Sequence, residues 1–243
     1  MTPLLAARGV SVRFGGLTAV DDVDLEIAQG ALIGIIGPNG AGKTTFFNAL
    51  SGVQRPSGGR LEAAGRDLTG RPPHVFARAG IARTFQTPRV FPEMTVADNV
   101  RFGLSFAGRR HRDAPAVLRD AAAILDFLGL AAAAAEPAQR ITPARRRLLE
   151  IGMALAARPR VLLLDEVAAG LTEAETRAMA ALIRRCRDEL GIAVVWIEHA
   201  VGVLMDAVER VVVLHQGRKL ADGAPAAVAR DAAVIEAYLG AAS

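Results

Sequence analysis

Hydrophobic residues recur along this chain in two kinds of short run. Residues 4–13 and 20–27 are strand-like, the second run alternates apolar and acidic side chains, and a Gly-Gly turn after Phe14 joins the two. Alternation is typical of strands with one buried face, so we expect an antiparallel pair here. Continuously apolar runs, which are typical of parallel strands buried on both faces, lie at residues 31–36, 161–164 and 193–197.

Weaker strand patterns alternate with helical patterns along the rest of the chain. The strand patterns lie at residues 60–64, 81–85, 210–215 and 218–221, and the helical ones at 45–50, 73–79 and 172–190. The last helix opens on Thr172 and Glu175, the spacing of a capping box. Strands that alternate with helices favour an α/β fold with a mainly parallel sheet, whose ligand binds at the carboxyl ends of the strands.

Residues 87–158 have a different character, because helical patterns dominate there. An Ala-rich segment predicts a helix over 114–130, and a second helix is expected over 145–157. In that second helix the apolar residues share one face, which leaves Arg146 and Glu150 as an exposed i,i+4 pair. We therefore expect a helical insertion within the α/β core.

The segment between the strand at 31–36 and the helix at 45–50 carries the chemistry. It fits the pattern G-x-x-x-x-G-K-[ST] with Gly37, Pro38, Asn39, Gly40, Ala41, Gly42, Lys43 and Thr44. Its glycines let backbone N–H groups turn towards phosphates, and the helix N-terminus adds partial positive charge. Lys43 supplies a point charge and Thr44 a hydroxyl for Mg²⁺. The chain is therefore expected to bind a nucleoside triphosphate.

Basic residues support this interpretation, because 27 of the 29 are arginines and Lys43 is one of only two lysines. A compact ammonium enters a tight phosphate nest that a planar guanidinium does not fit. The net charge is only +4 and the arginines are scattered, so we expect no nucleic-acid partner.

The remaining composition indicates a cytoplasmic protein. The single Cys186 lies in a helical pattern, allows no internal disulfide and is expected to be half-buried. No apolar run approaches the ~18 residues of a membrane span, and the N-terminus has no charged leader.

Polar residues follow four of the predicted strands. Asp165 can hold Mg²⁺ opposite Thr44, and Glu166 can polarise a water for attack on the γ-phosphate. Gln86 can touch both metal and water, and His199 can contact the γ-phosphate. Taken singly, such a histidine is more often a structural residue and Gln86 a loop residue. Phe14 can stack on a base or belong to the core.

The order of phosphate loop, strand-end Gln, helical insertion, Leu-Leu-Leu-Asp-Glu and strand-end His resembles the ATP-binding subunit of an ABC transporter over the whole chain. Residues 83–86, 164–171, 197–199 and 237–240 are similar to subunits of branched-chain amino acid importers. The resemblance implies one P-loop NTPase (RecA-like) domain. Residues 1–86 and 159–243 would form its nucleotide-binding core with an antiparallel β subdomain, and residues 87–158 its helical subdomain.

The resemblance also assigns roles to residues. Phe14 would stack on adenine, and the loop from Gly37 through Thr45 would hold the ATP phosphates. Thr44, Gln86 and Asp165 would surround Mg²⁺, Glu166 would be the catalytic base and His199 the switch. Residues 169–171 would cross to a partner subunit.

A membrane permease is the implied partner, on the inner face of the plasma membrane. The subunit would energise uptake of a hydrophobic amino acid or a related small amide without touching the solute. In the loop after Gln86, the apolar residues among 89–94 are expected to meet the permease, with packing inside the subunit as the alternative.

Two positions depart from the family pattern. The signature, usually Leu-Ser-Gly-Gly-Gln, reads Ile141, Thr142, Pro143, Ala144, Arg145 here, and Val167 replaces the proline after Glu166. Because the signature of one cassette serves the nucleotide of its partner, the change predicts a heterodimer with a different ABC ATPase.

Two alternatives stay open. One is a soluble ABC ATPase that acts on nucleic acid or ribosomes; such proteins generally carry two cassettes or a long arm, and this chain has neither. The other is the ATPase of an exporter, which only the resemblance to importer subunits argues against.

Overall fold

Two β-sheets form the frame of the molecule. The computed structural model describes residues 2–107 and 114–239. The smaller sheet is antiparallel, and its strands in order are β2 (Leu17–Ile27), β1 (Leu5–Phe14), β4 (Gly58–Ala63) and β5 (Arg66–Asp67). The antiparallel pairing expected at the start of the chain is thus confirmed.

The larger sheet carries the strands that end near the predicted site. Its order is β10 (Arg218–Gly223), β9 (Arg210–His215), β3 (Leu32–Ile36), β8 (Ala193–Ile197), β7 (Val161–Asp165) and β6 (Ile81–Arg83). All neighbours pair in parallel except β10, which is antiparallel to β9. In β7, Leu162 and Leu164 enter one hydrophobic core, and Val161 and Leu163 enter the other. The continuous apolar runs therefore reflect burial on both faces.

Helices cover both faces of this sheet. Those outside the insertion are α1 (Lys43–Leu50), α2 (Pro73–Arg78), α6 (Glu173–Asp188), α7 (Val201–Ala207), α8 (Pro225–Val228) and α9 (Ala232–Leu239). Phe46 and Phe47 of α1 are buried in the core shared with the small sheet. The predicted capping box of α6 is present, with Thr172 and Glu175 bonded reciprocally.

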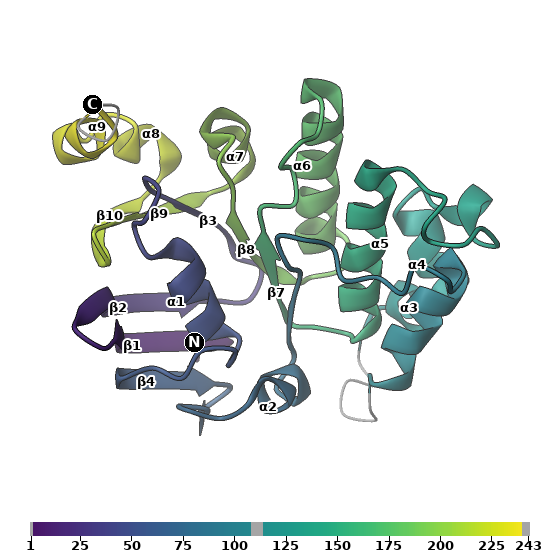
Figure 1. The fold of residues 1–243 in the computed structure, drawn as a ribbon, viewed down its shortest axis with the longest axis horizontal. Helices are drawn as coiled ribbons and strands as arrows, with labels where there is room; N and C mark the ends of the chain where they lie inside the picture. The colour runs from purple at the N-terminus through teal and green to yellow at the C-terminus, as the bar shows by residue number, and fades with distance from the viewer. Residues whose placement is uncertain (1, 108–113, 240–243) are drawn as a thin grey trace.

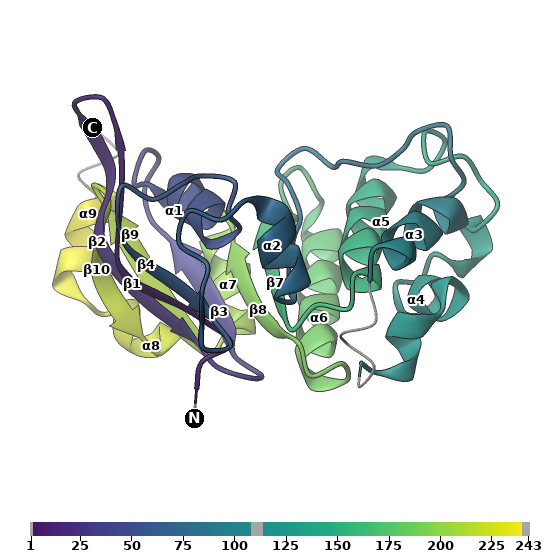
Figure 2. The same ribbon diagram turned by 90° about the horizontal axis from the view of Figure 1, so that it is seen from below.

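The insertion lies at the opposite end of the molecule from the small sheet (Figures 1 and 2). Its helices are α3 (Val96–Ser105), α4 (Ala121–Phe127) and α5 (Pro143–Ala156). The continuous helix expected over 114–130 is wrong: a 3₁₀ turn at Ala116–Arg119 precedes α4. Asp120 breaks it, because its extended backbone lets its carboxylate cap the N–H of Ala123 at 3.0 Å. Among the described residues, no helix is long and apolar enough to span a bilayer.

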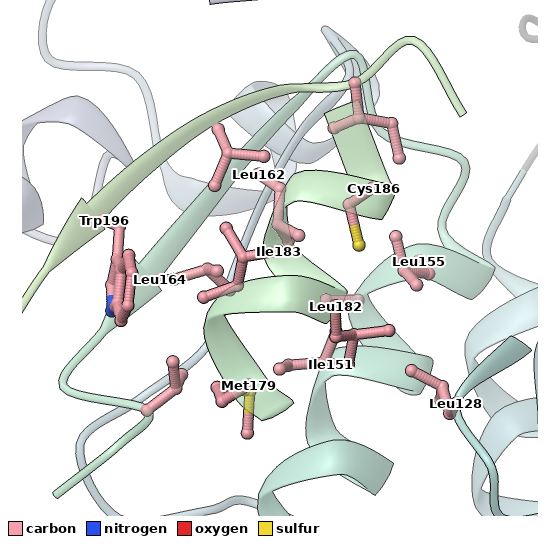
Figure 3. Close-up of a cluster of buried hydrophobic side chains, with 14 of the residues drawn as sticks. Leu128, Ile151, Leu155, Leu162, Leu164, Met179, Leu182, Ile183, Cys186 and Trp196 are labelled. Carbon is pink, nitrogen blue, oxygen red and sulfur yellow. The ribbon is translucent and has the colours of Figure 1, made fainter. Parts of the chain in front are cut away.

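Cys186 points from α6 into the core that α5, α6 and the large sheet share (Figure 3). The cysteine is buried rather than half-buried, and burial raises the pKa of its thiol to about 12. It is therefore a packing residue.

Candidate functional site

The phosphate loop depends on glycine at two close approaches. A Cβ at Gly37 would stand 2.1 Å from the carbonyl oxygen of Leu214, and one at Gly42 would stand 2.3 Å from that of Ala19. Gly42 also has φ of 94°, where side chains are strained. No residue with a side chain fits at these two positions of the loop between β3 and α1.

Lys43 lies inside this loop. Its Nζ donates to the carbonyl oxygens of Gly37 at 2.7 Å and Pro38 at 2.9 Å. Burial lowers the pKa of the lysine, and the charge of Glu166 opposes that shift. A phosphate oxygen can replace these carbonyls as acceptor, so the ammonium is already placed for an anion.

A cavity of about 210 Å³ opens in front of the loop. It is lined by Ala19, Asn39, Gly40, Ala41, Gly42, Lys43, Thr44, Thr45, Glu166 and His199. The predicted phosphate-binding residues and two of the predicted catalytic residues thus face the same space. Gly37 and Pro38 line a second cavity of about 290 Å³, which shares Asn39 and His199 with the first.

The predicted catalytic side chains meet because β3, β8, β7 and β6 are neighbours in the sheet. Glu166 Oε2 accepts a hydrogen bond from Gln86 Nε2 at 2.8 Å, and its Oε1 lies 2.9 Å from His199 Nε2. Glu166 is buried and has φ of 51°, a left-handed conformation uncommon for this residue type. Such strain is often retained at functional sites.

Asp165 supplies a test of the metal expectation. Its Oδ2 accepts from Arg83 Nη2 at 2.9 Å, whereas its Oδ1 is buried without a hydrogen-bond partner. Burial raises the pKa of this carboxyl, and Arg83 opposes the shift. Asp165 thus keeps a buried carboxylate oxygen without a partner, and the side chains of Thr44 and Gln86 are exposed. Carboxylate, hydroxyl and amide oxygens are the ligands that Mg²⁺ takes, so these residues fit the ion in their chemistry.

Phe14 stands at the end of β1 with 49% of its surface exposed. The core alternative for this residue is therefore wrong. A flat aromatic face at the edge of the small sheet remains available for stacking.

The expected exposed pair of Arg146 and Glu150 is wrong. Glu150 is buried, and its Oε1 accepts the N–H groups of Phe85 at 3.1 Å and Arg89 at 3.0 Å. Arg146 instead donates to the carbonyl of Gln139 at 2.7 Å. The helical face was misassigned because the partners of Glu150 are backbone groups about 60 residues away, which carry no signal in side-chain periodicity.

Arg83 was also missed as a site residue. Besides Asp165, its guanidinium donates to Asn48 Oδ1 at 2.7 Å and Ser51 Oγ at 2.9 Å, both at the end of α1. It therefore ties the helix after the phosphate loop to the strand that ends in Asp165. The sequence shows an arginine in the short strand before Gln86, but nothing in it points to Asp165 as the partner.

The altered signature lies at the start of α5, which begins at Pro143 rather than at Arg145. Thr142 is the N-cap, and its Oγ1 accepts the N–H of Arg145 at 3.3 Å. Pro143 has no N–H, and the N–H of Arg145 is bonded to Thr142. In the first turn of α5, the N–H of Ala144 is therefore the one still available to a ligand.

Phe91 of the loop after Gln86 forms an exposed aromatic cluster with Phe102 and Phe106, which lie at the end of α3. Their rings pack edge-on, with centroids 4.6 Å and 5.0 Å apart. The buried Asn99 fixes the backbone of Phe91, because its side chain bonds both the N–H at 2.8 Å and the carbonyl at 3.0 Å. Phe91 is 40% exposed but packs on Phe102 of its own subunit, and the neighbouring Val90 packs against the core, so both the docking interpretation and packing inside the subunit stay open.

The predicted C-terminal motif lies close to the phosphate loop. Tyr238 of α9 lines the 290 Å³ cavity together with Gly37, Glu198 and His199. Burial raises the pKa of its hydroxyl. Gly240, the last residue of that motif, lies outside the described residues.

Comparison with known proteins gives two family matches. Residues 20–169 match the model for ABC transporters, and residues 218–243 match the model for branched-chain amino acid ATP-binding cassette transporters.

Curated relatives match over nearly their full length. The high-affinity branched-chain amino acid transport ATP-binding protein BraF of Pseudomonas aeruginosa is 40% identical, with 98% of each chain covered. The corresponding protein LivG of Salmonella typhimurium is 39% identical over the same shares. Among solved structures, an ATP-binding cassette of an ABC transporter in its ADP conformation superposes with a TM-score of 0.87, at 28% identity, over 99% of this chain and 100% of that one.

Proposed function

This chain belongs to the ABC transporter family of ATP-binding cassettes, and we propose that it hydrolyses ATP to energise a membrane importer of branched-chain or other hydrophobic amino acids. The fold is that of a P-loop NTPase, as the resemblance implied. We assign residues 1–86 and 159–243 to the nucleotide-binding core with its β subdomain, and residues 87–158 to a helical subdomain.

The observation that carries the proposal is the meeting of Glu166, Gln86 and His199 in front of the Lys43 loop. We propose that residues 37–45 hold the phosphates, that Phe14 stacks on adenine and that Glu166 is the base for the attacking water. Thr44, Gln86 and Asp165 would hold Mg²⁺, which neutralises charge on the phosphates. His199 would contact the γ-phosphate, since its ring stands beside Glu166.

The test is reconstitution with the permease that co-purifies with this chain. In liposomes, we expect uptake of radiolabelled leucine that requires MgATP on the side of the cassettes. Co-purification with ribosomes, or ATP hydrolysis coupled to efflux instead of uptake, would favour one of the alternatives.

We propose that the permease docks on the aromatic cluster of Phe91, Phe102 and Phe106, which would hold the chain at the inner face of the membrane. All three rings are exposed, and Phe106 is the most exposed of them, at 71%. Exposed aromatic clusters on preorganised loops are typical of protein interfaces. The transported solute would have no contact with this subunit.

Phe91→Asp should abolish co-purification with the permease and leave the isolated subunit folded, because it places a charge in the docking surface without disturbing the bonds of Asn99. The matched control is Val53→Asp, another exposed apolar residue, outside the helical subdomain. Circular dichroism checks folding. An unfolded Phe91→Asp variant, or one that still assembles, would contradict the proposed surface.

We further propose that the chain pairs with a different ABC ATPase. In a head-to-tail pair, the turn at Thr142 to Arg145 would face the γ-phosphate that the partner holds. Pro143 offers that phosphate no N–H, the Cβ of Ala144 crowds the approach, and the N–H of Arg145 is already used by Thr142. A homodimer would carry this defect twice, whereas a partner with an intact signature leaves one good site, built on this chain's Lys43, Glu166 and His199.

An asymmetric pair predicts unequal effects of the same substitution. Changing Glu166 to Gln should lower turnover of the assembled transporter more than the equivalent change in the partner cassette. The subunit purified alone should hydrolyse ATP poorly. Robust hydrolysis by the subunit alone, or a larger loss from the partner's substitution, would refute the asymmetry.

A further inference from the structure

Helix α5 reaches into the site of its own chain through two side chains that none of the assigned roles uses. Arg147 and Glu150 lie three residues apart, so they share one face of the helix. That face is turned towards the two loops that carry Gln86 and Glu166.

Arg147 holds both loops by their carbonyl groups. Its Nη1 donates to the carbonyl oxygens of Glu166 at 3.0 Å and Gln86 at 3.3 Å, and its Nη2 donates to that of Ala169 at 2.8 Å. An arginine fork bonded to three carbonyls fixes their relative positions more firmly than one hydrogen bond does.

Glu150 holds the Gln86 loop by its N–H groups. The amides of Phe85 and Arg89, on either side of Gln86, both donate to the same oxygen, Oε1. Glu150 is buried, and desolvation raises its pKa to about 7. Burying a carboxylate is costly, so a role limited to filling space would be met better by an apolar residue.

These contacts leave the side chains of the two loops free to face each other. Gln86 Nε2 donates to Glu166 Oε2 at 2.8 Å, while Arg147 of α5 bonds the backbone carbonyls of both residues. We propose that Arg147 and Glu150 are positioning residues for ATP hydrolysis. From the helical insertion, they fix the positions of Gln86 and Glu166 relative to each other. The inference rests on the proposed function, because it concerns the geometry of the same site.

Glu150 offers a matched pair of variants. Glu150→Gln keeps an Oε1 that can accept both amides, whereas Glu150→Leu removes the acceptor. In the assembled transporter we expect Glu150→Gln to keep kcat within a few-fold of the parent and Glu150→Leu to lower it by about 10- to 100-fold, as misplacement of catalytic groups by about 1 Å does. ATP affinity should stay within about 3-fold in both, since the phosphate loop is untouched.

A second pair uses Arg147. Arg147→Met keeps the aliphatic stem and removes the donors, and should lower kcat like Glu150→Leu. Arg177→Met on α6 is its control, because that arginine is exposed and, among the described residues, pairs with the exposed Glu173 at 2.9 Å and with neither loop. If Glu150→Leu fails to fold, the Arg147 pair carries the test.

Non-additivity separates positioning from general destabilisation. In a Gln86→Ala background, Glu150→Leu should cause little further loss of kcat, because both changes remove the same arrangement. Hydrogen exchange of the Phe85 and Arg89 amides should speed up in Glu150→Leu and not in Glu150→Gln, a readout that needs no ATPase.

The outcomes are distinct. Faster exchange with unchanged kcat, additive losses, or a Glu150→Gln variant as impaired as Glu150→Leu would overturn the positioning role. Failure of the parent transporter to bind or hydrolyse ATP would instead refute the proposed function, while the exchange result would still report whether Glu150 holds the loop.

Discussion

Replacing Lys43 by alanine should abolish ATP binding by this chain in a nucleotide titration. The ammonium lies in the loop, bonded to the carbonyls of Gly37 and Pro38, and it would exchange these for the β- and γ-phosphates. Charge-assisted bonds of this kind contribute about 1.5–3 kcal/mol each, so losing two weakens binding by about 10²-fold or more.

Lys43→Arg should fail as well, although it keeps the charge. The ammonium lies inside the loop, bonded to the carbonyls of Gly37 and Pro38, and it faces the same cavity as Glu166. A planar guanidinium is wider than an ammonium and does not fit this space. The matched control is Lys219→Arg on the edge strand β10, where the half-buried lysine pairs with Asp222 at 2.9 Å. If Lys43→Arg bound ATP like the parent, the steric explanation would be wrong.

Glu166→Gln should leave ATP binding intact and lower turnover of the reconstituted transporter by about 10²–10⁴-fold, the range for losing a general base. The amide keeps the size of the side chain and an oxygen for the Gln86 bond. It cannot take a proton from water. Turnover is measured at saturating ATP, so that binding does not limit the rate.

Two results bear on the assignment of the base. Glu173→Gln is the control, because among the described residues this exposed glutamate pairs with Arg177 on the surface of α6 and with no residue of the site. Turnover of Glu166→Gln within a few-fold of the parent would place the base elsewhere. His199, whose Nε2 stands 2.9 Å from Glu166, would be the next residue to change.

The parts of the site that could be predicted from the sequence are those that local pattern determines. A strand, a Gly-rich turn and a helix in immediate succession identified the loop around Lys43. Apolar runs that end in Asp165 and His199 placed these residues at one edge of the sheet, since parallel strands share that edge.

The rest of the site depends on contacts between distant segments. Glu150 looks like a surface residue of an amphipathic helix, and only the fold reveals that two amides of the Gln86 loop use its carboxylate. Arg83 likewise shows no sign in the sequence of its bond to Asp165, which lies 82 residues away. The break at Asp120 was within reach of sequence reasoning, because Asp followed by helix-forming residues is an N-cap signal.

The burial of Cys186 makes the chain well suited to site-specific labelling. Maleimides react with thiolates, and a thiol with a pKa of about 12 inside a packed core offers almost none at neutral pH. A single cysteine introduced on an exposed surface, for example at Ala178 of α6, would therefore carry a fluorophore alone, with no need to remove the native thiol first. In denaturant Cys186 becomes reactive, so the same reagent reports unfolding of the core that α5, α6 and the large sheet share.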